Sequence, residues 1–114
     1  ARLEPGEPSG EIRRRVMLAR SIQAERYRDM PGVYTNAEVK SRDLVRVCGL
    51  GGEDIERLFR MIEKLDLSAR AYDKILRVAR TIADLAGREK VNDDDLKEAA
   101  GFRRLDEEEN SYLL

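Results

Sequence analysis

Residues 68–86 constrain the fold most, because they carry two separate apolar rows at helical spacing. Side chains three and four positions apart lie on the same face of an α-helix. Two rows therefore describe a helix that is covered on two sides, and such a helix must lie centrally in a bundle. We predict that Ser68 caps this helix and that Gly87 stops it. The rows are Ala71, Ile75, Val78, Ile82, Leu85 and Tyr72, Leu76, Ala79, Ala83, Ala86.

The remaining positions of the same segment form a charged third row, which we predict to face outward. Its members are Arg70, Asp73, Arg77, Arg80 and Asp84. Arg70 stands in the predicted first turn, where the positive end of the helix dipole disfavours a cation by about 0.3–1 kcal/mol unless an anion such as phosphate offsets it. The alternative is that Arg70 only pairs with Asp73 one turn on, which stabilises a helix by about 0.2–0.5 kcal/mol.

The rest of the chain has the composition and spacing of amphipathic helices. Hydrophobic residues make up 41% and charged residues 39%, whereas aromatic residues make up only 5%, which favours helices with solvated faces over a β-sandwich. Four further helices are predicted: residues 10–28 after Ser9, 41–48, 53–65, and a short last helix from Asn92 or Asp93 to about Phe102. A connector at 29–40 contains a short turn after Asn36. The predicted fold is an all-α bundle of four to five helices.

The two ends of the chain lack this periodicity. Residues 1–8 contain Pro5, Gly6 and Pro8 and are predicted to be a linker, in which the chain begins by a cut and not at a natural terminus. Residues 104–114 include a run of four acidic residues and are predicted to be a loose acidic tail. The predicted domain is therefore residues 9–103.

The residue types narrow the chemistry that this domain can perform. Histidine is absent, which removes the commonest general base and the usual zinc ligand. Cys48 is the only cysteine, so we interpret it as a small buried hydrophobe. A net charge of −1 speaks against a dedicated DNA-binding module. No apolar run is long enough for a membrane and no signal peptide opens the chain, so we predict a cytoplasmic protein without a membrane partner.

Nothing in the sequence predicts nucleotide hydrolysis by this chain alone. The Walker A pattern, whose glycine-rich loop and lysine hold the phosphates, is absent, and so is a Walker B strand. Gly49-Leu50-Gly51-Gly52 has no lysine and no preceding strand, so it is interpreted as a plain loop. Asp93-Asp94-Asp95 is interpreted as a cap and first-turn dipole partners, and no metal site is predicted.

One long segment and three shorter ones resemble a known family. Leu67-Ser68-Ala69-Arg70-Ala71-Tyr72 and its continuation to Leu85 resemble the C-terminal domain of magnesium-chelatase-related AAA+ proteins of the ComM (YifB) type. The opening helix, with Ser9, Ile12-Arg13, Arg15-Val16, Ala19-Arg20, Gln23 and Arg26, is similar to that of the family. So are the connector Asn36-Ala37-Glu38 and the segment from Val91 to Arg103. The resemblance covers about residues 7–103.

The resemblance implies a helical lid coupled to an AAA+ core that binds ATP and Mg²⁺ and works as a homohexamer. It implies that the parent is an ATP-driven DNA helicase that promotes branch migration in natural transformation. It also implies that the arginine of Ser68-Ala69-Arg70 is the second sensor arginine, which touches the γ-phosphate of ATP in its own subunit or in the neighbouring one. A guanidinium suits this task because it is always charged and binds phosphate as a fork.

Several further expectations accompany this one. Arg77 and Arg80 are candidate interface residues toward the core domain or a neighbouring subunit, unless they form ordinary salt bridges. Arg13, Arg14 and Arg15 are candidates for contact with DNA or with the core domain. The isolated chain is expected to be a monomer that binds no ATP and hydrolyses none. Two other functions stay open: the lid of a magnesium-chelatase motor subunit, and a free-standing helical adaptor that binds a protein partner.

Overall fold

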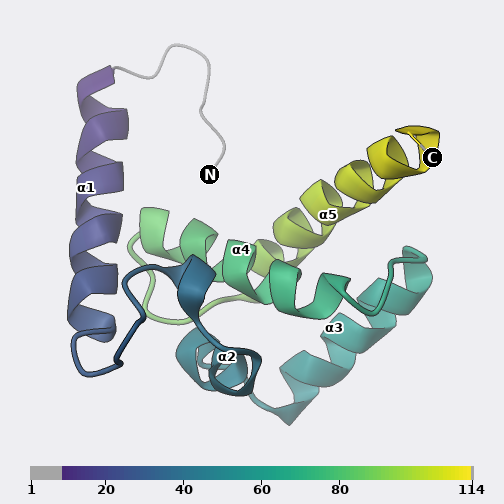
Figure 1. The fold of residues 1–114 in the computed structure, drawn as a ribbon, viewed down its shortest axis with the longest axis horizontal. Helices are drawn as coiled ribbons and strands as arrows, with labels where there is room; N and C mark the ends of the chain where they lie inside the picture. The colour runs from purple at the N-terminus through teal and green to yellow at the C-terminus, as the bar shows by residue number, and fades with distance from the viewer. Residues whose placement is uncertain (1–8, 114) are drawn as a thin grey trace.

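The computed structural model describes residues 9–113, with side chains from 9 to 107. Over this range it contains five α-helices and one 3₁₀ turn and no strand, which confirms the predicted all-α bundle. Figure 1 shows α4 in the middle of the other helices. The elements are α1 (Ser9–Arg26), η1 (Asn36–Glu38), α2 (Ser41–Cys48), α3 (Gly52–Lys64), α4 (Ala71–Leu85) and α5 (Asp93–Leu113).

The central position predicted for α4 is confirmed by its burial. Ala71, Ile75 and Ile82 of the first apolar row are buried, and so are Leu76, Ala79 and Ala83 of the second. Two members of the rows are exposed: Ala86, which follows the last residue of α4, and Val78, of which 38% is exposed. The Val78 side of the helix borders an open groove between α4 and α5 instead of a packed neighbour. The buried members of both rows belong to one hydrophobic core that also includes Leu44, Leu58, Leu96 and Ala99.

Helix boundaries follow the predicted signals at most points. α2 ends at Cys48 because Gly49 adopts a left-handed conformation with φ 71°, which suits glycine. Asn92 caps α5 through a reciprocal pair of hydrogen bonds, in which its side chain accepts from the amide of Asp95 and its amide donates to the Asp95 carboxylate, at 2.9 and 3.0 Å. The short turn after Asn36 is present as η1.

Two predicted boundaries are wrong. Ser68 does not cap α4 by its side chain; the helix begins at Ala71, and Arg70 is the residue that precedes it. The last helix does not end near Phe102, because α5 continues without a break to Leu113. Arg103 supports this extension by pairing with Asp106 at 2.8 Å and with Glu107 at 3.3 Å, one turn further along. The predicted linker at residues 1–8 lies outside the described residues.

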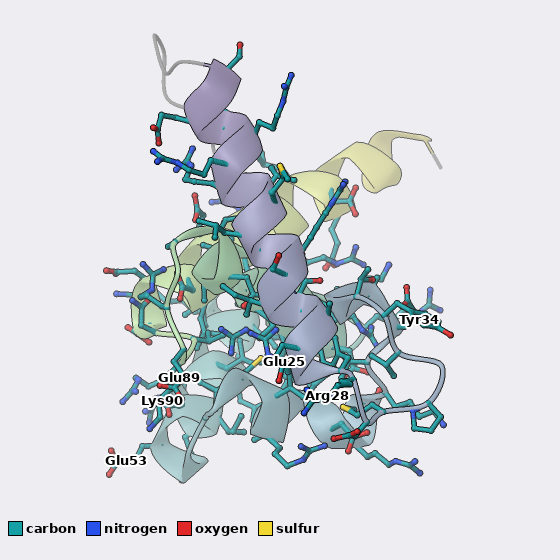
Figure 2. The ribbon with its side chains drawn as sticks, turned by 90° about the vertical axis from the view of Figure 1, so that its left-hand side faces the viewer. Glu25, Arg28, Tyr34, Glu53, Glu89 and Lys90 are labelled. Carbon is teal, nitrogen blue, oxygen red and sulfur yellow. The ribbon has the colours of Figure 1, made fainter. Side chains whose placement is uncertain are left out.

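α1 packs on the bundle most closely through its second half. Ala19 and Gln23 are its buried residues, whereas Met17 and Leu18 are 60% and 56% exposed. Figure 2 shows α1 nearest the viewer, with Glu25 and Arg28 at its lower end and Tyr34 on the following loop, pointing away from the bundle. Full burial within α1 is therefore confined to its second half.

The expectation that the third row of α4 faces outward is wrong in its second half, where Arg80 and Asp84 are each only 1% exposed. Arg80 donates hydrogen bonds to three main-chain oxygens, those of Val47, Arg88 and Glu89, each at 2.9 Å. Its guanidinium also lies 3.1 Å from the Asp84 carboxylate one turn on. Arg80 therefore holds the end of α2 and the loop before α5 against α4.

Asp84 is the acceptor at the centre of this buried polar cluster. Arg26 of α1 donates two hydrogen bonds to its carboxylate, at 2.6 and 3.0 Å, and the amide of Asn36 donates a third at 2.9 Å. Burial by itself lowers the pKa of Arg26, but the hydrogen bond and charge of Asp84 outweigh it and leave that pKa raised. Two cations and one amide thus compensate for one buried carboxylate.

Asn36 joins the remaining elements to the cluster. Its side-chain amide also donates to Thr81 Oγ1 at 3.0 Å, and its side-chain oxygen accepts from the Tyr27 hydroxyl. Its main-chain amide donates to the side chain of Gln23 at 3.2 Å. Burial raises the pKa of Tyr27 and keeps its hydroxyl a donor. α1, η1 and α4 are therefore tied together through polar side chains and not only through apolar packing.

Cys48 is fully buried in the core, as predicted, and its thiol lies 3.5 Å from the carbonyl oxygen of Leu76. Burial raises the pKa of this thiol from its ordinary 9.0 to about 11. Between pH 9 and pH 11 the thiol is therefore largely ionised in the unfolded chain but still protonated in the folded one. The native state therefore loses stability as the pH rises through this window.

We predict that the free energy of unfolding of the domain falls by about 2 kcal/mol between pH 9 and pH 11 because of Cys48. Cys48→Ala removes the titrating group, so its free energy of unfolding should fall less over this pH range. The fall that remains in this variant would come from other groups such as Tyr27. Urea denaturation at a series of pH values measures both slopes. Equal slopes in the two proteins would show that Cys48 does not cause the loss.

A second prediction concerns the buried carboxylate. Asp84→Asn keeps the size of the side chain but leaves Arg26 and Arg80 without their counter-charge, so we expect the free energy of unfolding to fall by about 3–5 kcal/mol. Asp43→Asn is the matched control, because Asp43 pairs with exposed Arg46 at 3.2 Å and should lose less than about 1 kcal/mol. Urea denaturation followed by circular dichroism compares the two, and similar losses would contradict a central role for Asp84.

Candidate functional site

Arg70 lies on a short loop that is fixed at both ends. α3 closes with Asp66 in a left-handed conformation, φ 54°, and with a hydrogen bond from the amide of Leu67 to the carbonyl of Ile62 at 2.9 Å. Two residues before Arg70, the amide of Ser68 donates to the Glu107 carboxylate of α5 at 3.0 Å. The carbonyl of Ser68 then accepts from the amide of Ala71 at 3.0 Å, where α4 begins. Arg70 is therefore carried on an ordered backbone.

The side chain of Arg70 is exposed and has no hydrogen-bond or ion-pair partner among the described side chains. The alternative pairing with Asp73 is not formed, and the carboxylate of Asp73 accepts a hydrogen bond from the Ser41 hydroxyl. Arg70 directly precedes the first turn of α4, where unpaired main-chain amides give a positive potential. The site combines a free guanidinium with a helix end that favours an anion.

Aromatic packing supports the same end of α4. The rings of Phe59 on α3 and Tyr72 on α4 are stacked, with centroids 5.1 Å apart and planes inclined by 10°. Phe59 is 55% exposed, so this stack lies at the surface near the start of α4. It joins α3 to α4 two residues after Arg70 and restrains the helix end that carries the arginine.

The two candidate interface arginines on α4 have partners within the domain. Arg77 donates two hydrogen bonds, at 3.2 and 2.9 Å, to the carbonyl oxygen of Val39, and so holds the end of the connector. Arg80 is buried in the Asp84 cluster and has no exposed surface to offer a partner. The structure assigns both residues a role inside the domain, and Arg70 is the one arginine of this row without such a role among the described residues.

Arg13, Arg14 and Arg15 do not share one face. Successive residues are about 100° apart around a helix, so the three side chains leave α1 in different directions. Arg14 pairs with Glu11, which raises the pKa of Arg14 and lowers that of Glu11, and Arg13 and Arg14 are exposed, whereas Arg15 is partly buried. They form the basic end of α1 and not a single flat patch.

The remaining sequence candidates have structural partners. Gly49 ends α2 and Gly51 precedes α3, so the glycine-rich stretch is a connection between helices. Asp95 belongs to the cap of α5 and also pairs with Arg88, while Asp93 lies 3.3–3.4 Å from Lys97 and Arg57. Within residues 9–107, no group of three or more metal-ligating side chains gathers. None of the described helices has the length and apolar character to cross a membrane.

Arg70 could be identified from the sequence, but the contacts that surround it could not. The anchor from Glu107 to Ser68 crosses 39 positions in the chain, so no local pattern indicates it. The cluster of Arg26, Asn36, Arg80 and Asp84 was likewise missed as a unit. Its only sequence signal is that Arg80 and Asp84 stand among the small, buried residues Ala79 and Ala83 of a helix that is covered on several sides.

The comparisons with known proteins agree on one family. Residues 6–103 match the family described as magnesium chelatase, subunit ChlI C-terminal. The chain is 40% identical to the competence protein ComM of Haemophilus influenzae over 100 residues, which are 88% of this chain and 19% of that protein. It is 36% identical to the uncharacterised protein YifB of Escherichia coli over 102 residues, 90% of this chain and 19% of that protein.

A mycobacterial relative shows the same proportions. The chain is 38% identical to an uncharacterised protein of Mycobacterium tuberculosis over 99 residues, 87% of this chain and 20% of that one. The chain thus spans about one fifth of the length of the relatives that it matches. On these matches and on its all-helical fold, the chain belongs to the magnesium chelatase ChlI C-terminal family, as a C-terminal domain of the ComM and YifB type.

Proposed function

We propose that this domain is the nucleotide-sensing lid of a hexameric AAA+ ATPase and that Arg70 is its sensor arginine. The observation that carries the proposal is the state of Arg70: an exposed guanidinium without a partner among the described side chains, on a backbone fixed by α3 and α5. A side chain of this kind is available to a ligand that the rest of the parent chain supplies. The core domain of the parent would provide ATP and Mg²⁺.

The chemistry of the site fits the γ-phosphate of ATP. A guanidinium offers two parallel N–H donors to phosphate oxygens and keeps its charge at any physiological pH. The cation is disfavoured beside the start of α4 until an anion arrives, so binding of phosphate removes an unfavourable interaction as well as adding a favourable one. Because the γ-phosphate is lost on hydrolysis, this contact differs between the ATP and ADP states.

The fold suits a part that moves as one body. Arg70 is joined to α4, and α4 is joined to α1, η1 and α2 through Asp84, Asn36 and Arg80. A displacement at Arg70 is therefore carried to the whole domain instead of being absorbed in a flexible loop. Rigid-body rotation of this kind is a common way to couple a nucleotide site to a neighbouring subunit.

For the parent we favour an ATP-driven motor on DNA that acts in branch migration, because a relative 40% identical to this chain is named a competence protein. The family description instead favours the lid of a magnesium-chelatase motor. Stimulation of ATP turnover by DNA distinguishes the two. A free-standing adaptor is the least favoured function, since the relatives carry the matching region as about one fifth of a longer chain.

The test of this function is Arg70→Ala in the full-length parent, measured as steady-state ATP turnover with and without DNA. We expect turnover at saturating ATP to fall by about 10- to 1000-fold, because an arginine that stabilises the transferring phosphoryl group contributes effects of at least this size. Arg70→Lys keeps the charge but not the two parallel donors, so its ATP turnover should lie between that of the wild type and that of Arg70→Ala.

Arg42→Ala is the matched control, because Arg42 is an exposed arginine at the start of α2, with a side chain 77% exposed and only a 3.8 Å contact to its neighbour Asp43. It should leave turnover unchanged. Sedimentation velocity and circular dichroism verify that all variants assemble and fold. The sensor role is refuted when Arg70→Ala, correctly assembled, turns over ATP as fast as Arg42→Ala.

A further inference from the structure

An open groove lies between α4 and α5, on the side of α4 that carries Val78. Its volume is about 670 Å³. Among its lining residues, Ile82 and Ala99 are buried in the core, whereas Val78 and Phe102 are 38% and 41% exposed. A groove of this size with exposed apolar side chains has room for one or two apolar side chains of a partner.

The positive charges of the groove are unevenly compensated. Arg103 pairs with two carboxylates of α5. Lys74 is exposed and forms no ion pair with a described side chain. Arg77 donates to a main-chain carbonyl oxygen, which is neutral, and the nearby carboxylate of Asp73 accepts from the Ser41 hydroxyl of α2. The α4 side of the groove therefore carries two cations without a counter-charge among the described residues.

The groove shares its side of α4 with Arg70. Positions 70, 74, 77 and 81 follow one another at spacings of four, three and four, which places them in one row along a helix. Lys74, Arg77 and Thr81 line the groove, and Arg70 precedes the first turn of α4. The groove therefore begins about one helical turn beyond the proposed sensor arginine.

This closeness indicates what lies over the groove. Residues four positions apart on a helix have Cβ atoms only about 5–6 Å apart, so a body that holds a phosphate against Arg70 also reaches Lys74. Under the proposed function, that body is the nucleotide-binding domain of the parent. The relatives have room for such a domain, since this chain spans only about one fifth of their length.

We infer that the nucleotide-binding domain whose ATP Arg70 contacts also docks in this groove, through an acidic segment that carries apolar side chains. The apolar side chains lie against Val78 and Phe102, and the carboxylates pair with Lys74 and Arg77. Opposite charge around an apolar contact steers association and fixes the orientation of the partner. This inference rests on the proposed sensor function and adds the surface that positions the domain around Arg70.

Nucleic acid fits the same surface less well. Its phosphates could pair with Lys74 and Arg77, but a phosphate backbone offers no apolar group to cover Val78 and Phe102. The net charge of the chain is −1, which gives no general attraction for DNA. An acidic protein segment with apolar side chains satisfies both the charges and the apolar surface.

The first test is a zero-length carbodiimide cross-link in the full-length parent with a non-hydrolysable ATP analogue bound. The reagent joins a lysine amine to a carboxylate in direct contact with it. We expect mass spectrometry to find Lys74 coupled to an aspartate or glutamate of the nucleotide-binding domain. The product should be lost in Lys74→Arg, which keeps the positive charge but has no amine to couple.

Lys97 is the internal control for this reaction, because its amine lies 3.3 Å from the Asp93 carboxylate and should be coupled to it. The inference is overturned when Lys97 is coupled in this way but Lys74 is not coupled to the nucleotide-binding domain. Coupling of Lys74 only to carboxylates of its own helical domain overturns it too. So does protection of Lys74 from amine-reactive reagents that appears only when DNA is added.

The second test measures whether the groove is covered, by the rate of reaction with a maleimide. Lys74→Cys is compared with Lys97→Cys in a parent without other exposed cysteines. The Lys97 side chain is 63% exposed, and it leaves α5 about 200° around the helix from Ala99 in the groove. Cys48 does not compete, because it is fully buried and its thiol pKa is about 11.

We expect Lys74→Cys in the folded parent to react about tenfold more slowly than Lys97→Cys, because a docked partner excludes the reagent. After unfolding in urea the two rates should be equal. Equal rates in the folded parent would contradict a covered groove.

Neither test depends on ATP turnover, so the two proposals can fail separately. When Lys74 is covered and coupled but Arg70→Ala keeps its turnover, the docking surface stands and the sensor role fails. When Arg70→Ala loses its turnover but Lys74 is neither covered nor coupled, the sensor role stands and the docking surface fails.

Discussion

The buried carboxylate of Asp84 is the interaction on which the rest of the domain depends. It accepts from Arg26 of α1 and Asn36 of η1 and lies 3.1 Å from Arg80, which in turn binds main-chain oxygens of α2 and of the loop before α5. Removing charges from water is costly, so such a cluster stabilises only when every member keeps its partners. Such a cluster specifies one arrangement of the helices. Apolar surfaces can pack in several similar ways, whereas this set of donors and acceptors is satisfied in only one.

The charged row on α4 therefore divides into two parts with different roles. Its second half, Arg80 and Asp84, is buried and fixes neighbouring elements, and Arg77 between the halves binds the connector. Its first member, Arg70, is exposed and has no partner among the described side chains. A sensor needs both features, because binding of a phosphate at the guanidinium moves the whole domain only when the helix that carries it is rigid. The polar cluster supplies the stiffness and Arg70 supplies the contact.

Much of the fold could be predicted from local sequence signals. The features that were predicted wrongly all depend on contacts between residues far apart in the chain. Periodicity located the helices and the central place of α4, and Gly49 and Asn92 marked their ends. Arg80 and Asp84 were assigned to the surface because single charged residues usually lie there. Their burial requires donors and acceptors from residues 26, 36, 47 and 88–89, which no local pattern brings together. The continuation of α5 was missed for the same reason, since its contact with Ser68 is long-range.

The second half of α5 reaches back to the loop that carries Arg70. Arg103 pairs with both Asp106 and Glu107, and Glu107 accepts the hydrogen bond from the amide of Ser68, two residues before Arg70. A ligand or partner that binds Arg103 or Asp106 would change how Arg103 is shared between the two carboxylates, and so would alter the carboxylate that positions this loop. Such binding and the proposed nucleotide contact would then be coupled, and by linkage each would change the affinity of the other by the same factor.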